Sequence, residues 1–294
     1  MGILNGKVAV VTGAGGGLGR AHAILMAKEG ARVVVNDLGG ARDGTGSGSA
    51  MADGVVSEIK KSGNEAVANY DSVSTPEGAG KIVHSAVQAF GKLDILVNNA
   101  GILRDRTFLK MSEEEWDSVI KVHLYGTYYC SKAAAAQMVK QGQGGRIIIT
   151  SSTSGIFGNF GQSNYGAAKS GVWGMMKTLA LEFMKHKITV NAVAPAAVTR
   201  MTEDLQRYKE GPGQELRAEL VSPTIVYLCS DEANDITGRT FYVRGNTVDM
   251  IDVVRVPVAD RPSKEPPWNI KDLGALIRKA AAGKPQEQET LKAK

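Results

Sequence analysis

A glycine-rich run near the amino terminus constrains the fold of this chain more than any other feature. Residues 7–12 (KVAVVT) form a short β-branched run, which is typical of a buried strand. Residues 12–19 (TGAGGGLG) follow directly and lead into a segment of helical composition. In such a strand–turn–helix unit, free N–H groups at the helix start favour a phosphate group. Gly13 allows the tight turn, Gly17 lets the backbone approach a pyrophosphate, and Gly19 allows close packing of the helix on the strand.

The alternation of strands and helices continues along the chain. Further strands are predicted at residues 32–36, 66–70, 94–97, 146–150, 188–192 and 240–244, and helices at 51–62, 76–90, 113–141 and 165–185. Strands that alternate with helices indicate βαβ units and a parallel sheet covered on both faces. We therefore expect a single α/β domain, a doubly wound, Rossmann-type sheet of seven parallel strands.

Segments outside this pattern suggest the domain boundaries and the loops. We expect the folded domain at residues 1–250, an extension at 251–282 that packs on the domain or on a neighbouring subunit, and a disordered tail at 283–294. Residues 39–48 contain five glycines, which predicts a mobile loop. Residues 199–218 are polar and contain Gly-Pro-Gly, which predicts a lid over a site.

Composition excludes several classes of protein. With 294 residues, 43% hydrophobic and 22% charged, the chain can bury a core, and it has no apolar run long enough for a membrane helix. No signal peptide is apparent, and two cysteines provide neither a disulfide framework nor a structural zinc site. Residues 255–294 carry nine basic and five acidic residues, which is +4 of the chain's net charge of +5. The basic character therefore lies in a solvated tail. We expect a cytoplasmic protein without a metal and without nucleic-acid or membrane partners.

An acidic residue supports the interpretation of the glycine turn. Asp37 ends the second predicted strand, 18 positions after Gly19. A carboxylate there binds the ribose hydroxyls of NAD and repels the 2′-phosphate of NADP. Gly16 stands directly before Gly17, where a basic residue could have held that phosphate. The predicted cofactor is therefore NAD.

A tyrosine and a lysine supply the chemistry of a second site. Tyr165 and Lys169 have i,i+4 spacing, which places both side chains on one helical face. A phenol near pKa 10 is a poor acid–base group at neutral pH, and a neighbouring ammonium lowers that pKa. Ser152 follows the fifth predicted strand, where its hydroxyl can hold a carbonyl or alkoxide oxygen against the tyrosine.

With these motifs in order, the chain resembles the short-chain dehydrogenases/reductases from about residue 4 to residue 250. Asn98-Asn99-Ala100-Gly101 after the fourth strand, Asp71 after the third and residues 191–195 (NAVAP) after the sixth belong to the same pattern. The resemblance implies that Ser152, Tyr165 and Lys169 are catalytic. It implies the following cofactor-binding residues: Gly13, Gly15, Gly17, Leu18, Gly19, Asp37, Asp71, Ser72, Val73, Asn99, Ala100, Gly101, Tyr165, Lys169 and Pro195.

Four segments are similar to one branch of that family, which contains the dehydrogenase unit of peroxisomal multifunctional enzyme type 2 and bacterial single-domain relatives. They are residues 35–40 (VNDLGG), 68–73 (ANYDSV), 100–106 (AGILRDR) and 154–162 (SGIFGNFGQ). This resemblance implies an NAD-dependent 3-hydroxyacyl-CoA dehydrogenase of lipid metabolism and β-oxidation, or of steroid metabolism. It implies a homodimer or homotetramer and a separate enoyl-CoA hydratase partner. The chain ends Leu-Lys-Ala-Lys, without a peroxisomal signal, so we expect a stand-alone bacterial enzyme.

Two features depart from the common family pattern. His123 stands where most members have an asparagine, and Pro195 is followed by Ala196 rather than by glycine. Either His123 only supports a bend in its helix, which we favour, or it joins a proton relay and titrates near neutral pH. Together with Ser152 and Tyr165, Gln162 is a candidate for substrate binding.

Other functions stay open at this stage. The enzyme alternatives are a dehydrogenase of hydroxysteroids or other secondary alcohols, and a 3-oxoacyl-carrier-protein reductase, whose usual NADPH is disfavoured by Asp37. The alternative outside enzymes is an NAD-binding regulatory or scaffold protein, against which the intact Ser152, Tyr165 and Lys169 argue. Arg104, Arg106 and Arg200 are candidates for contacts with CoA phosphates, or ordinary partners in surface ion pairs.

Overall fold

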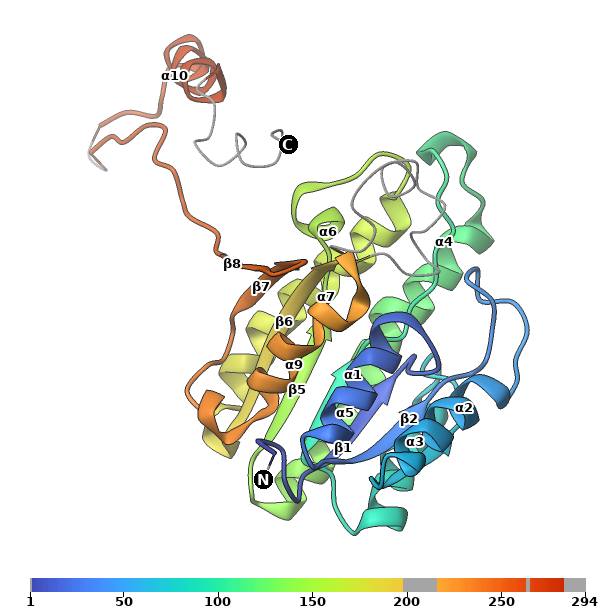
Figure 1. Ribbon diagram of the computed structural model, residues 1–294. Helices are drawn as coiled ribbons and strands as arrows, with labels where there is room; N and C mark the ends of the chain where they lie inside the picture. Colours follow the sequence, from blue (N-terminus) through green and yellow to red (C-terminus); the bar gives the residue numbers. More distant parts are fainter. Residues whose placement is uncertain (1, 198–215, 263–264, 283–294) are drawn as a thin grey trace. The chain divides into compact units, whose positions relative to one another are not determined.

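The strands of this protein form one sheet in the order β3-β2-β1-β4-β5-β6-β7-β8 (Figure 1). The structure is a computed structural model that describes residues 2–197, 216–262 and 265–282. The strands are β1 (Val8–Thr12), β2 (Arg32–Asn36), β3 (Ala66–Asn69), β4 (Ile95–Asn98), β5 (Gly145–Thr150), β6 (Ile188–Ala196), β7 (Thr240–Arg244) and β8 (Thr247–Ile251). The principal helices are α1 (Gly17–Lys28), α2 (Ala50–Lys61), α3 (Pro76–Phe90), α4 (Glu113–Ile120), α5 (Gly126–Gln141), α6 (Thr153–Phe157), α7 (Ser163–Glu182), α9 (Ser222–Cys229) and α10 (Ile270–Ala282).

Helices cover both faces of the sheet, because alternate residues of each buried strand point to opposite sides. In β1, Val8 and Val10 belong to the core under α3, α5 and α7. Ala9 and Val11 belong to the core under α1, α2 and α9. The expected doubly wound α/β architecture is therefore confirmed.

The strand count differs from the prediction. Seven strands pair in parallel as expected, and β8 is an additional strand that pairs antiparallel with β7. Its apolar Val248 and Met250 are exposed, so it lacks the buried run that marks the other strands. The two residues between the strands, Gly245-Asn246, form a recognised hairpin signal that could have revealed it.

The predicted helix at 113–141 is interrupted. It consists of α4, a five-residue π-helical turn (η2, Lys121–Tyr125) and α5. A π turn inserts a residue into the helical repeat and often marks a functional site. Here it holds His123, which is buried.

The chain divides into two units, residues 1–251 and 252–294. In the second unit, the described residues contain the helix α10, in which no residue is buried. The predicted lid lies largely outside the described residues, and so does the tail at 283–294. In the ranges that the structure describes, no helix is long and apolar enough to cross a membrane.

Candidate active site

A cleft of about 310 Å³ lies at the carboxyl ends of the parallel strands, where α/β sheets bind their ligands. It unites most of the residues predicted for the cofactor and for catalysis. The predicted residues that line it are Gly13, Gly17, Leu18, Asp37, Asp71, Ser72, Val73, Asn99, Ala100, Gly101, His123, Tyr165, Lys169 and Pro195. Gly15, Gly19, Ser152 and Gln162 are not among its lining residues.

In the glycine turn, neighbouring backbone atoms lie so close to Gly13 and Gly19 that no side chain would fit there. Gly13 has φ +63°, and a Cβ there would lie 2.7 Å from the Cα of Ala100. A Cβ on Gly19 would lie 2.2 Å from the carbonyl oxygen of Gly13. The Asn99 side chain donates to the carbonyl oxygens of Thr12 and Gly13, both at 3.0 Å. These contacts form the narrow cradle that a pyrophosphate group requires, so the residues fit a dinucleotide.

The Asp37 carboxylate connects the turn to the loop after β2. One oxygen accepts a hydrogen bond from the Gly15 N–H at 2.7 Å, and the other accepts one from the Gly39 N–H at 2.8 Å. The group is thus held at the edge of the cleft, which Gly16 and Arg42 also line. A carboxylate at this point suits a ribose diol and disfavours a phosphate.

Asn36 and Asn69, which were not predicted from the sequence, form a polar network that supports Asp71. The Asn36 amide donates to the side-chain oxygen of Asn69 at 2.8 Å and to the Asp71 carbonyl at 2.9 Å. The Asn69 amide in turn donates to the Asp71 carboxylate at 2.9 Å. Polar residues at the ends of β2 and β3, two strands that otherwise read as buried, were the available signal.

The catalytic candidates meet on α7 and at the end of β5. Lys169 is buried, its Nζ lies 5.5 Å from the centroid of the Tyr165 ring, and it donates to the carbonyl oxygen of Thr150. Ser152 caps α6 by accepting a hydrogen bond from the Ser154 N–H at 3.1 Å, and its hydroxyl acts to lower the pKa of Tyr165. The predicted serine, tyrosine and lysine therefore do come together.

The acid–base properties differ from the expectation that the lysine lowers the tyrosine pKa. Burial raises the pKa of Tyr165 to about 12, although its hydrogen bond to Ser152 acts in the opposite direction. Burial also lowers the pKa of Lys169 to about 7. The reason is that desolvation disfavours the charged form of both groups. The Tyr165 phenol is therefore protonated at neutral pH and can donate its proton as a general acid.

His123 faces both the tyrosine and the loop after β4. Its ring meets that of Tyr165 edge-on, with centroids 5.0 Å apart. Its Nε2 lies 2.8 Å from the carbonyl oxygen and 3.1 Å from the backbone nitrogen of Ile102. Burial, with the nearby Lys169, lowers the pKa of His123 to about 3, and its Nδ1 has no partner among the described residues. The imidazole is therefore neutral at physiological pH.

Gln162 and Asn164 hold loops around the site. The Gln162 Nε2 donates to Asp105, and its Oε1 accepts hydrogen bonds from Ser154 and Asn159. Both acceptor positions of the amide oxygen are therefore used within the protein. Asn164, which the sequence reading missed, is fully buried and donates to the carbonyl oxygens of Arg104 and Glu115. It fixes the start of α7 and hence the position of the neighbouring Tyr165.

The arginine candidates for CoA contacts are engaged in ion pairs. Arg104 pairs with Glu114 at 2.9 Å, and Arg106 pairs with Glu115 at 3.0 Å. Arg200 lies outside the described residues. The sequence left two roles open for these residues, contacts with CoA phosphates or ordinary surface ion pairs. The structure shows ion pairs for Arg104 and Arg106.

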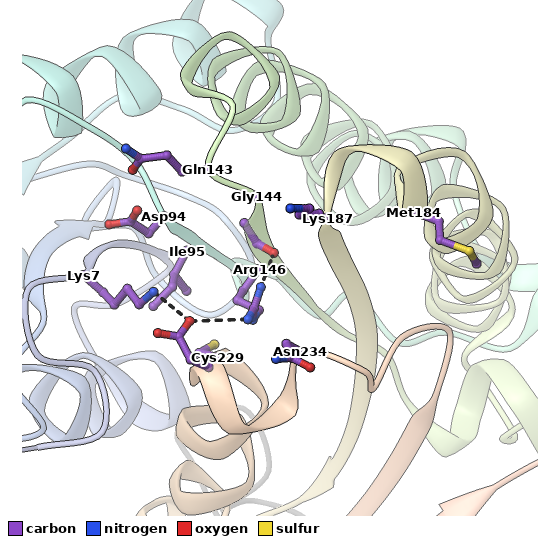
Figure 2. A pocket seen from close by; sticks show the side chains of 12 residues that line it. Lys7, Asp94, Ile95, Gln143, Gly144, Arg146, Met184, Lys187, Cys229 and Asn234 are labelled. Atoms are coloured by element: carbon purple, nitrogen blue, oxygen red, sulfur yellow. Dashed lines mark hydrogen bonds and ion pairs between the residues drawn. The ribbon is translucent and has the colours of Figure 1, made fainter.

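A second hollow, of about 430 Å³, lies at the opposite edge of the sheet (Figure 2). Its walls come from the starts of β1, β4 and β5, whereas cofactors bind at the carboxyl ends. In this hollow, Asp231 forms ion pairs with Lys7 at 2.8 Å and with Arg146 at 3.5 Å. Asp231 thus partly offsets the positive charge of these two residues, and the hollow is separate from the active site.

A doubly wound sheet with a dinucleotide cradle and a tyrosine–lysine pair at its carboxyl edge defines a nicotinamide-dependent oxidoreductase. The chain matches the short chain dehydrogenase family over residues 7–210, and it belongs to that family. The cofactor of such enzymes is NAD or its phosphate, and the cradle with Asp37 suits NAD.

Relatives support the same assignment. The chain is 54% identical to a putative short-chain type dehydrogenase/reductase, Rv0148, of Mycobacterium tuberculosis, over 83% of this chain and 84% of that one. It is 51% identical to peroxisomal multifunctional enzyme type 2 of Drosophila melanogaster, over 79% of this chain but only 38% of that one. It is 38% identical to hydroxyacyl-CoA dehydrogenase ChsB1 of M. tuberculosis, over 97% and 92%. A crystal structure of a short chain dehydrogenase from Mycobacterium avium matches with a TM-score of 0.84 and 42% identity, over 97% and 98% of the two chains.

Proposed function

We propose that this oxidoreductase interconverts a 3-hydroxyacyl-CoA and a 3-ketoacyl-CoA with NAD. The observation that carries the proposal is the similarity to a protein named hydroxyacyl-CoA dehydrogenase, which extends over nearly the whole of both chains. Similarity to the multifunctional enzyme supports the same substrate class, although this chain spans only part of that protein.

The chain's own residues perform the proton chemistry. In reduction, the Tyr165 phenol, which burial keeps protonated, donates its proton to the developing alkoxide oxygen. In oxidation, the reacting form is the phenolate, and its oxygen takes the proton from the alcohol. Ser152 orients the substrate oxygen against Tyr165. Lys169, whose Nζ lies 5.5 Å from the centroid of the Tyr165 ring, stabilises the phenolate when its amine is protonated, a form that burial disfavours.

Residues of the cradle hold the cofactor. Gly13, Gly17 and Asn99 line the part of the cleft proposed for the pyrophosphate, and Asp37 is proposed to bind the ribose hydroxyls. When bound, the nicotinamide ring supplies the acceptor or donor of the hydride. Lys169 also lines the cleft and is proposed to contact the ribose of the nicotinamide.

His123 is proposed as a supporting residue. Because it is neutral and bonds to Ile102, it fixes the loop that carries Gly101 against the π turn. A Cβ on Gly101 would lie 2.3 Å from the imidazole Cε1, so the two residues pack directly. The Gln162 side chain is proposed to shape the substrate end of the cleft through its contacts with Asp105 and Ser154.

A substrate panel tests the proposal. We would measure kcat/KM for (3R)- and (3S)-hydroxyacyl-CoA thioesters, short thioester mimics and hydroxysteroids, each with NAD and NADP. The expected result is the highest value for a hydroxyacyl-CoA with NAD. Higher values for hydroxysteroids, or for an acyl-carrier-protein substrate with NADPH, would favour the alternative dehydrogenase or reductase function. Binding of NAD without turnover of any alcohol would favour a regulatory role.

Assembly and location complete the proposal. A homodimer or homotetramer is proposed, with residues 251–282 packing on the domain or a neighbouring subunit, because Val253, Val254 and Val256 are exposed within the second unit. A separate enoyl-CoA hydratase would supply the hydroxyacyl substrate. The free, buried Cys130 and Cys229 agree with a cytoplasmic location. Light scattering of the full chain, and of a chain that ends at Ile251, tests the role of the extension in assembly.

A further inference from the structure

The loop between β2 and α2 forms part of the wall of the cofactor cleft. We call residues 38–48 the clasp. Its residues Gly40, Ala41, Arg42 and Gly44 line the cleft together with the glycine turn and Asp71. The sequence predicts only a mobile glycine-rich connection here, so this contribution to the cleft comes from the structure.

The clasp is a compact loop with its ends tied together. The Gly48 N–H donates to the Leu38 carbonyl at 2.9 Å, and a Cβ on Gly39 would lie 1.9 Å from the Gly48 oxygen. Near the tip, the Ala41 N–H donates to the Thr45 carbonyl at 2.7 Å. A loop of this length whose ends lie close together is an Ω-loop, a compact class of loop that is frequently functional.

The tip of the clasp is attached to the loop that follows β4. The Leu103 N–H donates to the Arg42 carbonyl at 3.1 Å. The Arg104 Nε–H donates to the Asp43 carbonyl at 2.9 Å. A Cβ on Gly44 would lie 3.2 Å from two side-chain carbons of Ile102, so the clasp also packs against apolar surface.

This attachment crosses the cofactor cradle. In the sheet, β1 lies between β2 and β4, and the glycine turn leaves from the end of β1. A connection between the loop after β2 and the loop after β4 therefore passes over the end of β1. Both ends of the connection are fixed: Asp37 binds the Gly39 and Gly15 N–H groups, and Ile102 bonds to the buried His123.

We propose that the clasp retains the nicotinamide cofactor, and that its contacts with residues 102–104 must open before the cofactor dissociates. Gly44 and Arg104 are then positioning residues for cofactor binding. This inference rests on the nicotinamide cofactor proposed above, but it is independent of the identity of the alcohol substrate.

The test measures NADH dissociation without substrate. NADH bound to the full chain is displaced by excess NAD in a stopped-flow instrument, and its fluorescence gives the dissociation rate. Arg104→Gln removes the bond to the Asp43 carbonyl, and we expect the rate to rise about fivefold, the ratio for loss of one ordinary hydrogen bond. Gly44→Ala, at a residue with φ +86°, should raise the rate independently.

Glu114→Gln is the matched control. It removes the ion pair of Arg104 with Glu114 but leaves the bond to Asp43, so the NADH dissociation rate should stay within twofold of the wild type. Trypsin cleavage after Arg42 in the absence of NADH reports attachment of the clasp, and it should be faster in Arg104→Gln than in Glu114→Gln.

The possible outcomes are distinct. Faster cleavage with an unchanged NADH dissociation rate in both Arg104→Gln and Gly44→Ala would overturn the inference. The contacts of the clasp with residues 102–104 would then hold the loop in place without retaining the cofactor. An equal rise in Glu114→Gln would also overturn it, because the ion pair rather than the clasp would be responsible. If the wild type bound no NADH, the cofactor proposal itself would fail, whereas failure to turn over a hydroxyacyl-CoA leaves the measurement intact.

Discussion

Replacing His123 with asparagine separates the two roles that this residue could have in the proton path. In the structure, the imidazole is buried, neutral and bonded through Nε2 to Ile102. A supporting role requires only packing and that hydrogen bond. A relay that depends on protonation requires an imidazole that titrates within the working pH range.

The pKa of His123 determines what each measurement should show. Burial lowers it from 6.5 to about 3, so the protonated fraction at pH 6 is about 10⁻³. The pH–rate profile should therefore contain no imidazole inflection between pH 6 and 7. Folding is affected instead: the unfolded state binds a proton below pH 6.5 and the folded state does not, so stability falls as the pH decreases toward 3. Between pH 7.5 and 5 this amounts to roughly 2 kcal/mol for one histidine.

Two assays on wild type and His123→Asn test this reasoning. The variant should keep substantial activity and a pH–rate profile of the same shape. Its unfolding free energy in urea, compared between pH 7.5 and 5, should fall by about 2 kcal/mol less than that of the wild type. His84→Asn, on the exposed side of α3, is the matched control and should leave both results unchanged. An inflection between pH 6 and 7 that disappears only in His123→Asn would refute the neutral imidazole.

The remaining predictions concern the cradle and the catalytic pair. Tyr165→Phe should remove nearly all turnover while NADH still binds, as measured by fluorescence titration, because the ring remains and only the hydroxyl is lost; more than a tenth of wild-type activity would contradict its role. Lys169→Ala should weaken NADH binding and reduce kcat together. Asp37→Ala should narrow a 10- to 1000-fold preference for NAD over NADP, roughly 1.4 kcal/mol per tenfold, and equal efficiency with both cofactors in the wild type would refute the assignment. Gly19→Ala should cost roughly 1–3 kcal/mol of stability, measured by urea unfolding, and abolish NADH binding, because the new Cβ would lie 2.2 Å from the Gly13 carbonyl oxygen.

Local patterns in the sequence are sufficient for the architecture and for most of the site. The apolar strands, the glycine turn and Asp37 predict the parallel sheet and its cradle, because each is a short, continuous pattern that is typical of a buried strand or of a phosphate-binding turn. The i,i+4 spacing likewise places Tyr165 and Lys169 on one face of α7. These features require no knowledge of distant contacts.

Tertiary structure alone decides what depends on segments far apart in the chain. The π turn at His123 belongs to a helix whose sequence is compatible with a regular repeat. The pKa of Tyr165 rises because the fold removes its hydroxyl from solvent, which the i,i+4 spacing alone does not predict. The clasp shows the same limit, since nothing in residues 38–48 indicates that they bond to residues 102–104. That contact exists because the sheet places β1 between β2 and β4, so the loops that follow these two strands can meet only across the cradle.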